Sequence, residues 1–469
     1  MDIAEKKYDV AIIGSGPAGM SAALEIKKLK SDAKIVIFEQ GKIRLTADRG
    51  NAEHSTRGWG GAGAFSDGKL NLTWDSGGQL IEVIPREKFK ELMRYVDEQY
   101  LAFDDNKGPL KIPSAKKAKK LRDEAWAAGF KDFIYYPTRH WGTDAAYFIV
   151  EKIRQHLLNH GVEIFLETKI TDLKDLGEEF SIWSEAHREF KSRVVIMAGG
   201  RGSNEQTSKI AETFGLEVQD NGIDIGVRIE TLAGCFEKFT DVVQSPKLVY
   251  RTNRNDKEVR TFCVCPYGFV KLELSYGILT VNGESYSESS GIKSKNTNFA
   301  VLVHEKFDDS FHDPIGYGNK IASLANHLGR GLVIVQTLSD FLKGRRSTEK
   351  RIQESAVRPT LKEAIPGSIG SVLPYDFMAA IEEFLKEPLR KVAPAMNPNN
   401  VLIYGGEVKQ YAKKIMVNEN CESAQKRLYF VGDGGGYTRG IMQASMQGII
   451  SGRHITEEYI GNLPLKPNT

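Results

Sequence analysis

The feature that most constrains this chain is a strand, a glycine-rich turn and a helix close to its N-terminus. Residues 8–13 are a short apolar run typical of a buried parallel strand, and they lead into G-x-G-x-x-G at residues 14–19 and then into a helix-forming segment. In this arrangement Gly14 permits the tight turn, Gly16 lets a pyrophosphate approach the backbone, and Gly19 lets the helix pack on the strand. The sequence therefore predicts a dinucleotide-binding unit.

A second apolar strand supports this interpretation. Residues 34–38 form this strand, and Glu39 follows it directly, 20 residues after Gly19. A carboxylate at this position can accept hydrogen bonds from ribose hydroxyls and disfavours a 2′-phosphate. The free N–H groups at the start of the preceding helix would face the phosphates. The expected ligand is therefore FAD or NAD rather than NADP.

Composition narrows the class of protein. With 469 residues, 41% hydrophobic and 27% charged, the chain has the composition of a soluble globular protein of two or three domains. Lys and Arg number 64 against 61 Asp and Glu, a balance that speaks against nucleic-acid binding. No transmembrane run or signal peptide is recognisable, and four cysteines are too few for a disulfide framework. A reducing, cytoplasmic location is expected.

The far end of the chain decides between the two ligands. Residues 427–431 are another apolar strand, followed by a glycine-rich turn at 432–436 and a helix rich in small residues over 437–448. This strand–Gly-Asp–helix unit resembles the second flavin motif of the glutathione-reductase-type FAD superfamily. The resemblance implies FAD, with Asp433 on the ribityl chain and the helix that begins near Gly440 aimed at the pyrimidine edge of the flavin.

Three further segments match that fold. Residues 193–200 look like the strand and Gly-Gly turn on the adenine side, and residues 163–170 look like the strand that ends beside the adenine. The glycine-rich segment 58–72 suits a loop pressed against a flat ring system. Together the segments most resemble the FAD-dependent dehydrogenases known as NAD(FAD)-utilising dehydrogenases. This resemblance spans the whole chain and does not indicate the substrate.

The motifs and the resemblance together predict a set of FAD-binding residues. They are Gly14, Gly16, Pro17, Ala18, Gly19, Glu39, Gln40, Arg57, Gly61, Ala62, Gly63, Ala64, Ser66, Lys69, Ile170, Ala198, Gly199, Gly200, Gly432, Asp433, Gly440, Ile441 and Met442. His54, six residues before Gly60, also resembles the flavin-linked histidine of the succinate dehydrogenase and fumarate reductase family. Non-covalent FAD is expected, and covalent attachment through His54 stays open.

The predicted fold is α/β, with a discontinuous Rossmann-like FAD-binding domain over 1–79, 138–222 and 396–469. A helical insertion is expected at 80–137. Residues 223–395 alternate short strands with turn-rich joints and end in helices, which predicts a mainly antiparallel substrate or cap domain. Since no second strand–G-x-G-x-x-G–helix unit is recognisable, NAD(P)H is expected only as a transient electron donor.

Candidate catalytic residues come from the cap domain and the second flavin motif. Cys265 stands one residue after Cys263 on a predicted strand, so the two side chains are expected to point the same way and form one wall of a pocket. A redox role, simple packing and, less favoured, metal binding remain open for this pair. Tyr267 and Tyr286 can donate protons to a substrate or serve only as hydrogen-bonded sheet residues. Arg439 is expected either to hold negative charge on the flavin or to tie down its loop.

The function expected from these features is that of an FAD-dependent dehydrogenase or reductase. It would transfer a hydride between flavin N5 and a C=C or C=X bond of an organic substrate. The alternatives are a flavin monooxygenase and, in a different class, an FAD-containing RNA-modifying or structural flavoprotein. The expected partners are a small-molecule substrate and, as a further candidate, an electron-carrier protein, with no nucleic acid and no metal. The oligomeric state is not indicated.

Overall fold

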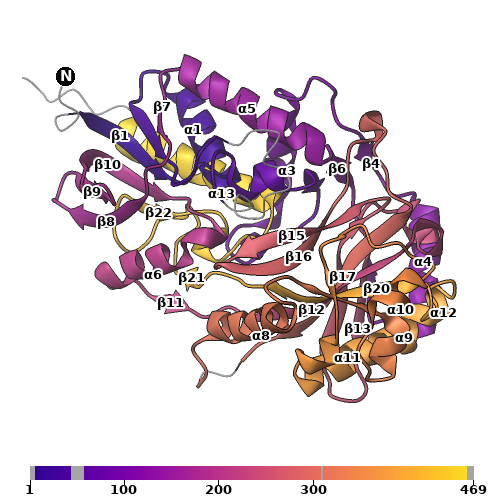
Figure 1. Ribbon diagram of the computed structural model, residues 1–469. Helices are drawn as coiled ribbons and strands as arrows, with labels where there is room; N and C mark the ends of the chain where they lie inside the picture. Colours follow the sequence, from indigo (N-terminus) through magenta and orange to yellow (C-terminus); the bar gives the residue numbers. More distant parts are fainter. Residues whose placement is uncertain (1–5, 44–56, 308–309, 462–469) are drawn as a thin grey trace, which may run out of the picture.

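The chain builds two large sheets, and the first and last segments of the sequence share one of them (Figure 1). The computed structural model describes residues 6–43, 57–307 and 310–461. In Figure 1 the indigo N-terminal strands and the yellow C-terminal helix lie together, and the second sheet with its orange helices lies beside them. The predicted α/β class with a discontinuous nucleotide-binding part is confirmed.

The first sheet has seven strands in the order β7-β2-β1-β10-β9-β8, with β22 also paired to β10. Its members are β1 (Lys7–Ile13), β2 (Ile35–Phe38), β7 (Glu163–Phe165), β8 (Ile170–Asp175), β9 (Phe180–Ser184), β10 (Glu189–Met197) and β22 (Leu428–Phe430). The pairs β7–β2, β2–β1, β1–β10 and β10–β22 are parallel, whereas β8, β9 and the start of β10 form an antiparallel meander. The parallel strands are mainly apolar along their paired parts because both of their faces are covered.

Helices cover both faces of this sheet. They are α1 (Pro17–Leu29), α3 (Arg86–Leu101), α5 (Thr143–Asn159) and α13 (Ile441–Ile455) around one hydrophobic core, and α6 (Asn204–Thr213) on the other. α1 and α13 come from opposite ends of the sequence and pack along each other. Gly448 makes this approach possible, since a Cβ there would lie 2.1 Å from the carbonyl oxygen of Ala18. The small residues of the C-terminal helix thus serve close packing.

The insertion contacts a helix that covers the first sheet, and it adds a strand to the second sheet. It contains η4 (Leu80–Glu82), α3, β4 (Leu110–Lys111), α4 (Ala115–Ala128) and β5 (Asp132–Ile134). α3 packs on α13, whereas α4 packs on β5 and on α12 (Pro388–Val392) of the second part. β4 joins β6 (Thr138–His140) and β3 (Lys69–Asn71) in a small sheet. The segment is mainly helical, as predicted, but its last strand pairs with the second large sheet.

The second sheet has eight strands in the order β19-β18-β20-β12-β17-β14-β13-β5. They are β19 (Ile365–Pro366), β18 (Ile334–Thr337), β20 (Val401–Lys409), β12 (Ile223–Leu232), β17 (Asn296–Glu305), β14 (Glu258–Cys265), β13 (Lys247–Arg251) and β5. All neighbours are antiparallel except β18 and β19, which agrees with the expected antiparallel sheet. β20 lies between β18 and β12, so this part of the fold reaches Lys409, beyond the boundary expected at 395.

The two faces of the second sheet differ in chemistry. On β12 the residues Ile225 and Val227 belong to an apolar core, which α11 (Tyr375–Lys386) and α12 cover. Their neighbours Arg228 and Glu230 point to the opposite face and are nevertheless fully buried. The hairpin of β15 (Phe269–Ser275) and β16 (Ile278–Glu284) lies between the two large sheets in Figure 1. One face is therefore an ordinary core, and the other is polar and enclosed.

The remaining elements are short, apart from one further helix. They are α2 (Gly61–Phe65), α7 (Glu237–Thr240), α8 (Pro314–Leu328), α9 (Leu338–Leu342), α10 (Glu349–Gln353), β11 (Val218–Gln219), β21 (Lys414–Ile415), η5 (Arg201–Ser203), η6 (Ala233–Cys235), η7 (Glu288–Ser290), η8 (Ile369–Ser371), η9 (Asp433–Gly435) and η10 (Thr456–Ile460). Within the part of the chain that the structure describes, no helix is both long enough and apolar enough to cross a membrane.

Candidate active site

One cavity of about 370 Å³ runs between the two large sheets. On one side its lining begins at the turn after β1 and includes the ends of β2 and β10 and the starts of α1 and α13. On the other side the lining comes from β13, β14, the β15–β16 hairpin and the end of β20. The cavity therefore joins the nucleotide-binding motifs to the polar face of the second sheet. A volume of this size is typical of a small-molecule or cofactor site.

The three glycines of the first turn have the roles that the sequence predicts. Gly14 has a φ of 112°, and a Cβ on it would lie 2.3 Å from the carbonyl oxygen of Ala198. A Cβ on Gly19 would lie 2.1 Å from the carbonyl oxygen of Gly14, so this glycine sets the contact between α1 and β1. Around Gly16 a Cβ would meet nothing within 4 Å, which leaves room for a ligand against the backbone.

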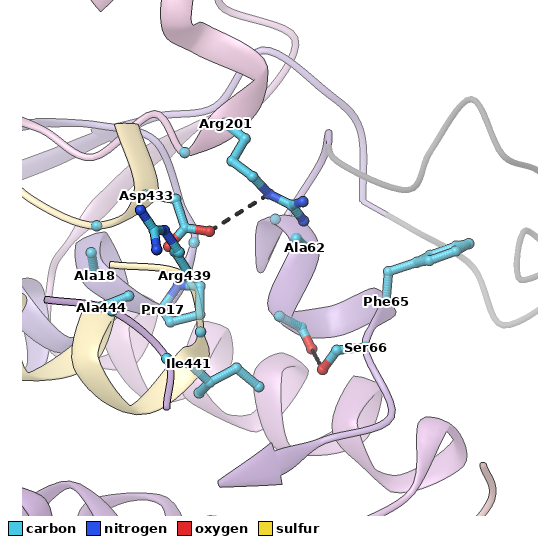
Figure 2. A pocket seen from close by; sticks show the side chains of 18 of the residues that line it. Pro17, Ala18, Ala62, Phe65, Ser66, Arg201, Asp433, Arg439, Ile441 and Ala444 are labelled. Atoms are coloured by element: carbon cyan, nitrogen blue, oxygen red, sulfur yellow. Dashed lines mark hydrogen bonds and ion pairs between the residues drawn. The ribbon is translucent and has the colours of Figure 1, made fainter. Parts of the chain in front are cut away.

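Two helices begin at this cavity without a side-chain cap. Gly16 is the N-cap of α1 and Gly440 is the N-cap of α13, and neither helix start receives a side-chain capping hydrogen bond. In Figure 2 Pro17 and Ile441, the first residues of these helices, both face the cavity. Uncapped N–H groups and the positive end of each helix dipole favour a negatively charged group in front of them. The cavity thus offers two such positions for one ligand.

Glu39 organises the turn as well as facing the cavity. Its Oε2 accepts hydrogen bonds from the hydroxyl of Ser15 at 2.7 Å and from the Ser15 amide at 3.3 Å. Its Oε1 accepts from the amides of Gly41 and Gly58, both at 2.9 Å. The carboxylate therefore ties the phosphate-binding turn to the start of the glycine-rich segment. A ribose hydroxyl would have to share it with these four donors.

The glycine-rich segment 58–72 is more regular than the predicted loop, because it contains the short helix α2 and the strand β3. It packs directly on the first turn, since a Cβ on Gly61 would lie 3.3 Å from the Cα of Gly16 and one on Gly63 would lie 2.8 Å from Cγ of Pro17. The segment thereby lines the cavity next to the start of α1.

Lys69 lines the cavity, but its amino group is engaged by the protein. Nζ donates to Asp67 and to the carbonyl oxygen of Val264, both at 2.6 Å, and lies 3.5 Å from Sγ of Cys265. Burial alone would lower the pKa of Lys69, but the Asp67 carboxylate holds it above its ordinary value. The hydrogen bond to Val264 fastens β3 to β14, so Lys69 has a structural role, and its contact with the cofactor stays a prediction.

Asp433 lies among positive charges in the cavity, as Figure 2 shows. Its carboxylate accepts a hydrogen bond from the Thr438 hydroxyl at 2.9 Å and forms an ion pair with Arg201 at 3.6 Å. Burial raises the pKa of Asp433, and the nearby guanidinium groups of Arg201 and Arg439 counteract this only in part. The guanidinium of Arg439 lies 3.4 Å from the centroid of the Tyr411 ring and lines the cavity. This position does not favour a purely loop-tying role for Arg439.

Most of the predicted FAD-binding residues line this single cavity. They are Gly14, Gly16, Pro17, Ala18, Glu39, Gln40, Gly61, Ala62, Gly63, Ser66, Lys69, Ile170, Ala198, Gly199, Gly200, Gly432, Asp433, Gly440 and Ile441. Gly19, Ala64 and Met442 are buried behind the lining, and Arg57 is exposed outside it. His54 lies outside the described residues. With open space at Gly16 and Gly200 and two uncapped helix starts, these residues fit FAD.

The prediction that Cys263 and Cys265 share one pocket wall is wrong. The pairing of β14 with β17 shifts register between Phe262 and Cys265, and Cys263 has a φ of 47°. This bulge breaks the alternation of a regular strand. As a result Cys263 lines the cavity, whereas Cys265 is fully buried and directs its thiol toward Asp67 at 3.6 Å. Burial raises the pKa of Cys265 to about 12, so its thiol stays protonated.

Neither tyrosine that was predicted to be catalytic lines the cavity formed by the described residues. The hydroxyl of Tyr267 donates to the carboxylate of Glu237, outside the cavity. The ring of Tyr286 packs edge-on against Phe269, with ring centroids 5.8 Å apart. Tyr136 takes their place as a cavity-lining tyrosine, and burial raises its pKa to about 12, so that its hydroxyl keeps its proton at neutral pH.

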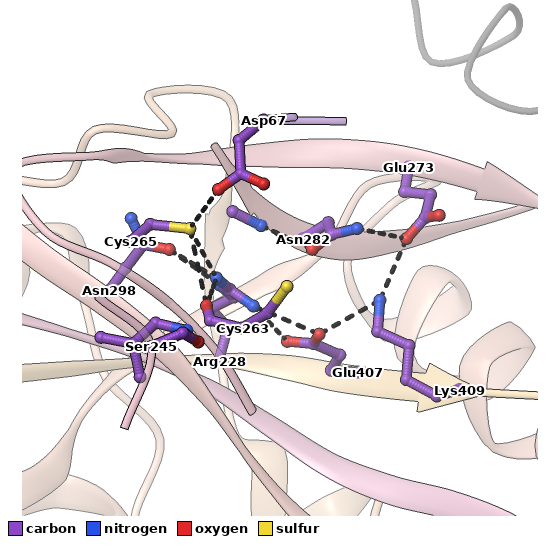
Figure 3. Close-up of polar contacts among 12 residues, drawn as sticks. Asp67, Arg228, Ser245, Cys263, Cys265, Glu273, Asn282, Asn298, Glu407 and Lys409 are labelled. Carbon is purple, nitrogen blue, oxygen red and sulfur yellow. Dashed lines mark hydrogen bonds and ion pairs between the residues drawn. The ribbon is translucent and has the colours of Figure 1, made fainter. Parts of the chain in front are cut away.

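A buried ion network forms the floor of the cavity on the side of the second sheet (Figure 3). Lys409 contacts Glu273 at 3.1 Å and Glu407 at 3.2 Å, and Arg228 contacts Glu407 at 3.4 Å. Arg228 also donates to the carbonyl oxygen of Cys263 at 2.8 Å, which fixes the bulge. Burial alone would raise the pKa of Glu273, but Lys409 and Arg201 lower it to about 2.

Sequence reasoning missed the positively charged lining on this side. Lys247 from β13 and Arg260 from β14 both line the cavity, and each places its charge 5.2 Å from the ring centroid of Phe262. Lys271 from β15 lines the cavity as well and pairs with Glu284 at 3.2 Å. In the sequence these residues alternate with apolar ones, which is typical of a strand with one face in solvent. This alternation was the only sequence signal for them.

Two family models match successive parts of the chain. Residues 9–219 match the model described as FAD dependent oxidoreductase, and residues 223–409 match the model described as FAD-dependent protein, C-terminal domain-like. An uncharacterized protein of Clostridium beijerinckii is 24% identical over 500 residues, which cover 97% of this chain and 82% of that protein.

Two solved structures illustrate the more distant similarity. Glycine oxidase from Geobacillus kaustophilus has 12% identity and a TM-score of 0.42, with 98% of this chain and 97% of that chain covered. A flavoprotein/dehydrogenase from Cytophaga hutchinsonii has 14% identity and a TM-score of 0.39, with 96% and 78% covered. These similarities are too distant to indicate a substrate. Taken together, the two matched regions and the cavity that joins them identify the chain as an FAD-dependent oxidoreductase.

Proposed function

We propose that this FAD-dependent oxidoreductase is a dehydrogenase or reductase that acts on a C=C or C=X bond of a small organic substrate. The observation that carries the proposal is the single cavity that reaches from the uncapped starts of α1 and α13 to the polar face of the second sheet. One end has the features of a nucleotide site, and the other end has room and polar groups for a second molecule. The strand–Gly-Asp–helix unit supports placement in the glutathione-reductase-type superfamily, close to the NAD(FAD)-utilising dehydrogenases.

When bound, FAD supplies the hydride donor or acceptor at its N5 atom. The chain's own residues then have three tasks. The N–H groups at the starts of α1 and α13 bind negative charge, and Asp433, held by Thr438, offers an acceptor for hydroxyl groups. The second sheet and the β15–β16 hairpin cover the cavity and exclude water. Tyr136, which keeps its proton at Oη, is the candidate to donate that proton to the substrate.

Electrons must enter or leave through a second molecule. The described residues contain no second strand–G-x-G-x-x-G–helix unit that would hold a second dinucleotide. We therefore propose a transient NAD(P)H visit or an electron-carrier protein. A nucleic-acid partner remains disfavoured by the near-neutral charge. The four cysteines are free, which supports a reducing, cytoplasmic location, and thiol labelling of protein in freshly opened cells would test it.

The experiment that tests the reaction class starts from FAD-loaded protein reduced by light in the absence of oxygen. We expect slow reoxidation in air and fast reoxidation by a quinone or another organic acceptor, followed by the visible absorption of the flavin. Fast reoxidation in air with incorporation of labelled oxygen into a product would instead establish the monooxygenase alternative. A salt-dependent mobility shift of tRNA would support the RNA-modifying alternative.

A further inference from the structure

Two cationic side chains on the cap side of the cavity, Arg260 and Lys247, are only partly engaged by protein groups. Lys69, Lys271 and Lys409 are each within 3.2 Å of a carboxylate oxygen. Arg260 donates to both carboxylate oxygens of Asp224 from Nη2, at 2.9 and 3.0 Å, and its Nη1 lies 4.0 Å from Oε1 of Glu258. Its Nε is buried and has no hydrogen-bond acceptor among the described residues. A buried guanidinium N–H without an acceptor is costly unless a ligand supplies one.

Lys247 lies next to this unsatisfied group. The side chain of Lys247 is 7% exposed, and Nζ donates at 3.0 Å to the carbonyl oxygen of Asp75. Within the described ranges no carboxylate oxygen comes within ion-pair distance of this ammonium group. Val249 pairs with Arg260 across β13 and β14, and residues two apart on a strand share a face. Lys247, Arg260 and Phe262 therefore project together into the cavity.

We propose that the redox substrate is an organic anion whose carboxylate binds to Lys247 and Arg260 beside the ring of Phe262. This inference rests on the proposed function and specifies the substrate class for the same cavity. One ammonium group without a carboxylate in contact, together with one free guanidinium N–H, matches a monoanion. A dianionic phosphate would bring more negative charge than the two groups balance, because Asp224 already neutralises most of Arg260. Phe262 supplies apolar surface for the carbon skeleton next to the carboxylate.

The surroundings of Lys247 make this recognition dependent on pH. The charged and titratable groups that face it are Arg260 and Cys263 from β14, Asp224 from β12 and Asp75 from the loop after β3. Burial, with Arg260 beside it, lowers the pKa of Lys247 to about 8. Only the protonated ammonium attracts a carboxylate, so the dissociation constant should rise as the pH passes 8. Above that value the rise should continue until it levels off at the affinity that remains without the ammonium charge.

The test uses the FAD-loaded full chain and equilibrium calorimetry, with the flavin spectrum as a second readout. Phenylacetate serves as the carboxylate probe, phenylacetamide as its uncharged analogue, and inorganic phosphate as the competing oxyanion. We expect phenylacetate to bind about tenfold or more tightly than phenylacetamide, the difference expected for a charge-assisted hydrogen bond. Lys247→Met should weaken phenylacetate binding by about tenfold or more and leave phenylacetamide binding almost unchanged.

Two further variants keep the test interpretable. Lys247→Arg retains a charge that does not titrate, so it should still bind phenylacetate but lose the rise in dissociation constant above pH 8. Lys238→Met removes a positive charge from an exposed ion pair with Glu124, away from the cavity lining, and should leave binding unchanged. The FAD content of each variant shows whether the cofactor-binding part has folded.

The outcomes separate this inference from the proposed function. Equal binding of phenylacetate and phenylacetamide, or full phenylacetate binding by Lys247→Met, would overturn the carboxylate site while the redox function stands. Tighter binding of phosphate with the same dependence on Lys247 would overturn the assignment to carboxylates. Carboxylate binding by FAD-loaded protein that exchanges no electrons with any acceptor would overturn the proposed function instead.

Discussion

The two walls of the cavity differ in the groups that they expose, backbone on one side and charged side chains on the other. The nucleotide-binding wall consists mainly of backbone, with Gly14 and Gly16 at the first turn and uncapped helix starts at Pro17 and Ile441. The opposite wall consists mainly of charged side chains from β13, β14, β15 and β20. A backbone wall can be specified by a local motif and tolerates few substitutions. A side-chain wall can change its chemistry one residue at a time, so we infer that the first wall fixes the cofactor and the second selects the substrate.

The largest effect is expected from adding a side chain to the backbone wall. Gly14→Ala would place a Cβ 2.3 Å from the carbonyl oxygen of Ala198 in a residue with positive φ. Backbone cannot move away as a flexible side chain can, so the first turn must distort. We expect affinity for FAD to fall by about a hundredfold or more, since several phosphate contacts depend on this turn. Fluorescence titration of the apoprotein with FAD measures the effect.

Gly177→Ala is the matched control for this change. Gly177 also has a positive φ, of 94°, but a Cβ there would meet nothing within 4 Å. The strain of the left-handed conformation should cost about 1–2 kcal/mol of stability and leave FAD binding intact. If both variants bound FAD as the wild type does, the backbone wall would not control the cofactor.

An intermediate effect is expected from breaking the ion network of the side-chain wall. Arg228 and Glu407 are both fully buried, and Arg228→Leu would leave the carboxylate with Lys409 alone. Removing one member of a buried pair typically costs about 3–5 kcal/mol, which corresponds to a fall of roughly 10 °C in the thermal unfolding midpoint. Circular dichroism of FAD-loaded protein would measure it.

The double variant Arg228→Leu with Glu407→Leu sharpens this prediction. Replacing both charges removes the carboxylate that Arg228→Leu leaves without its partner. The thermal unfolding midpoint of the double variant should therefore lie well above that of Arg228→Leu. A double variant that is less stable than Arg228→Leu alone would show that Arg228 stabilises the domain mainly through its bonds to Asn298 and Cys263.

The smallest effect is expected from Arg439, where the two walls meet. Its guanidinium stacks on Tyr411 and adds positive charge close to the start of α13. Negative charge near N1 and O2 of the flavin ring should be stabilised by that charge. Arg439→Met should therefore lower the two-electron midpoint potential by a few tens of millivolts, at about 30 mV for each tenfold change. Spectroelectrochemical titration would detect it.

Lys414→Met is the control for Arg439→Met, because Lys414 forms an ion pair with Glu82 and does not line the cavity. The flavin midpoint potential of Lys414→Met should stay at the wild-type value. If Arg439→Met stayed loaded with FAD and kept the wild-type potential, Arg439 would serve only to pack against Tyr411.

The difference between the walls also explains what the sequence could predict. Gly14, Gly16, Gly19 and Asp433 were recognisable because they stand in short motifs with a fixed spacing. Lys247 and Arg260 were not, because a strand that alternates charged and apolar residues reads as one with a solvent-facing side. Only the pairing of β13 with β14 and the packing of the first sheet above them enclose those charges.

Local irregularity and long-range pairing account for the other differences. The sequence predicts that the side chains of Cys263 and Cys265 lie on one wall of the cavity. A bulge in β14 against β17 instead points the two side chains in different directions. No residue type at that place signals a bulge. The limit of the cap domain was misplaced because β20 joins a sheet whose other members lie far away in sequence. Such pairings follow from topology, which local patterns do not specify.

The most direct test of the account is the flavin content of the purified protein. Denaturing extraction followed by chromatography identifies the released nucleotide, and its absorbance gives the ratio of flavin to chain. We expect a yellow protein that holds FAD in a one-to-one ratio, or that reaches this ratio when apoprotein is incubated with FAD. A colourless protein that cannot be reconstituted with FAD would contradict it.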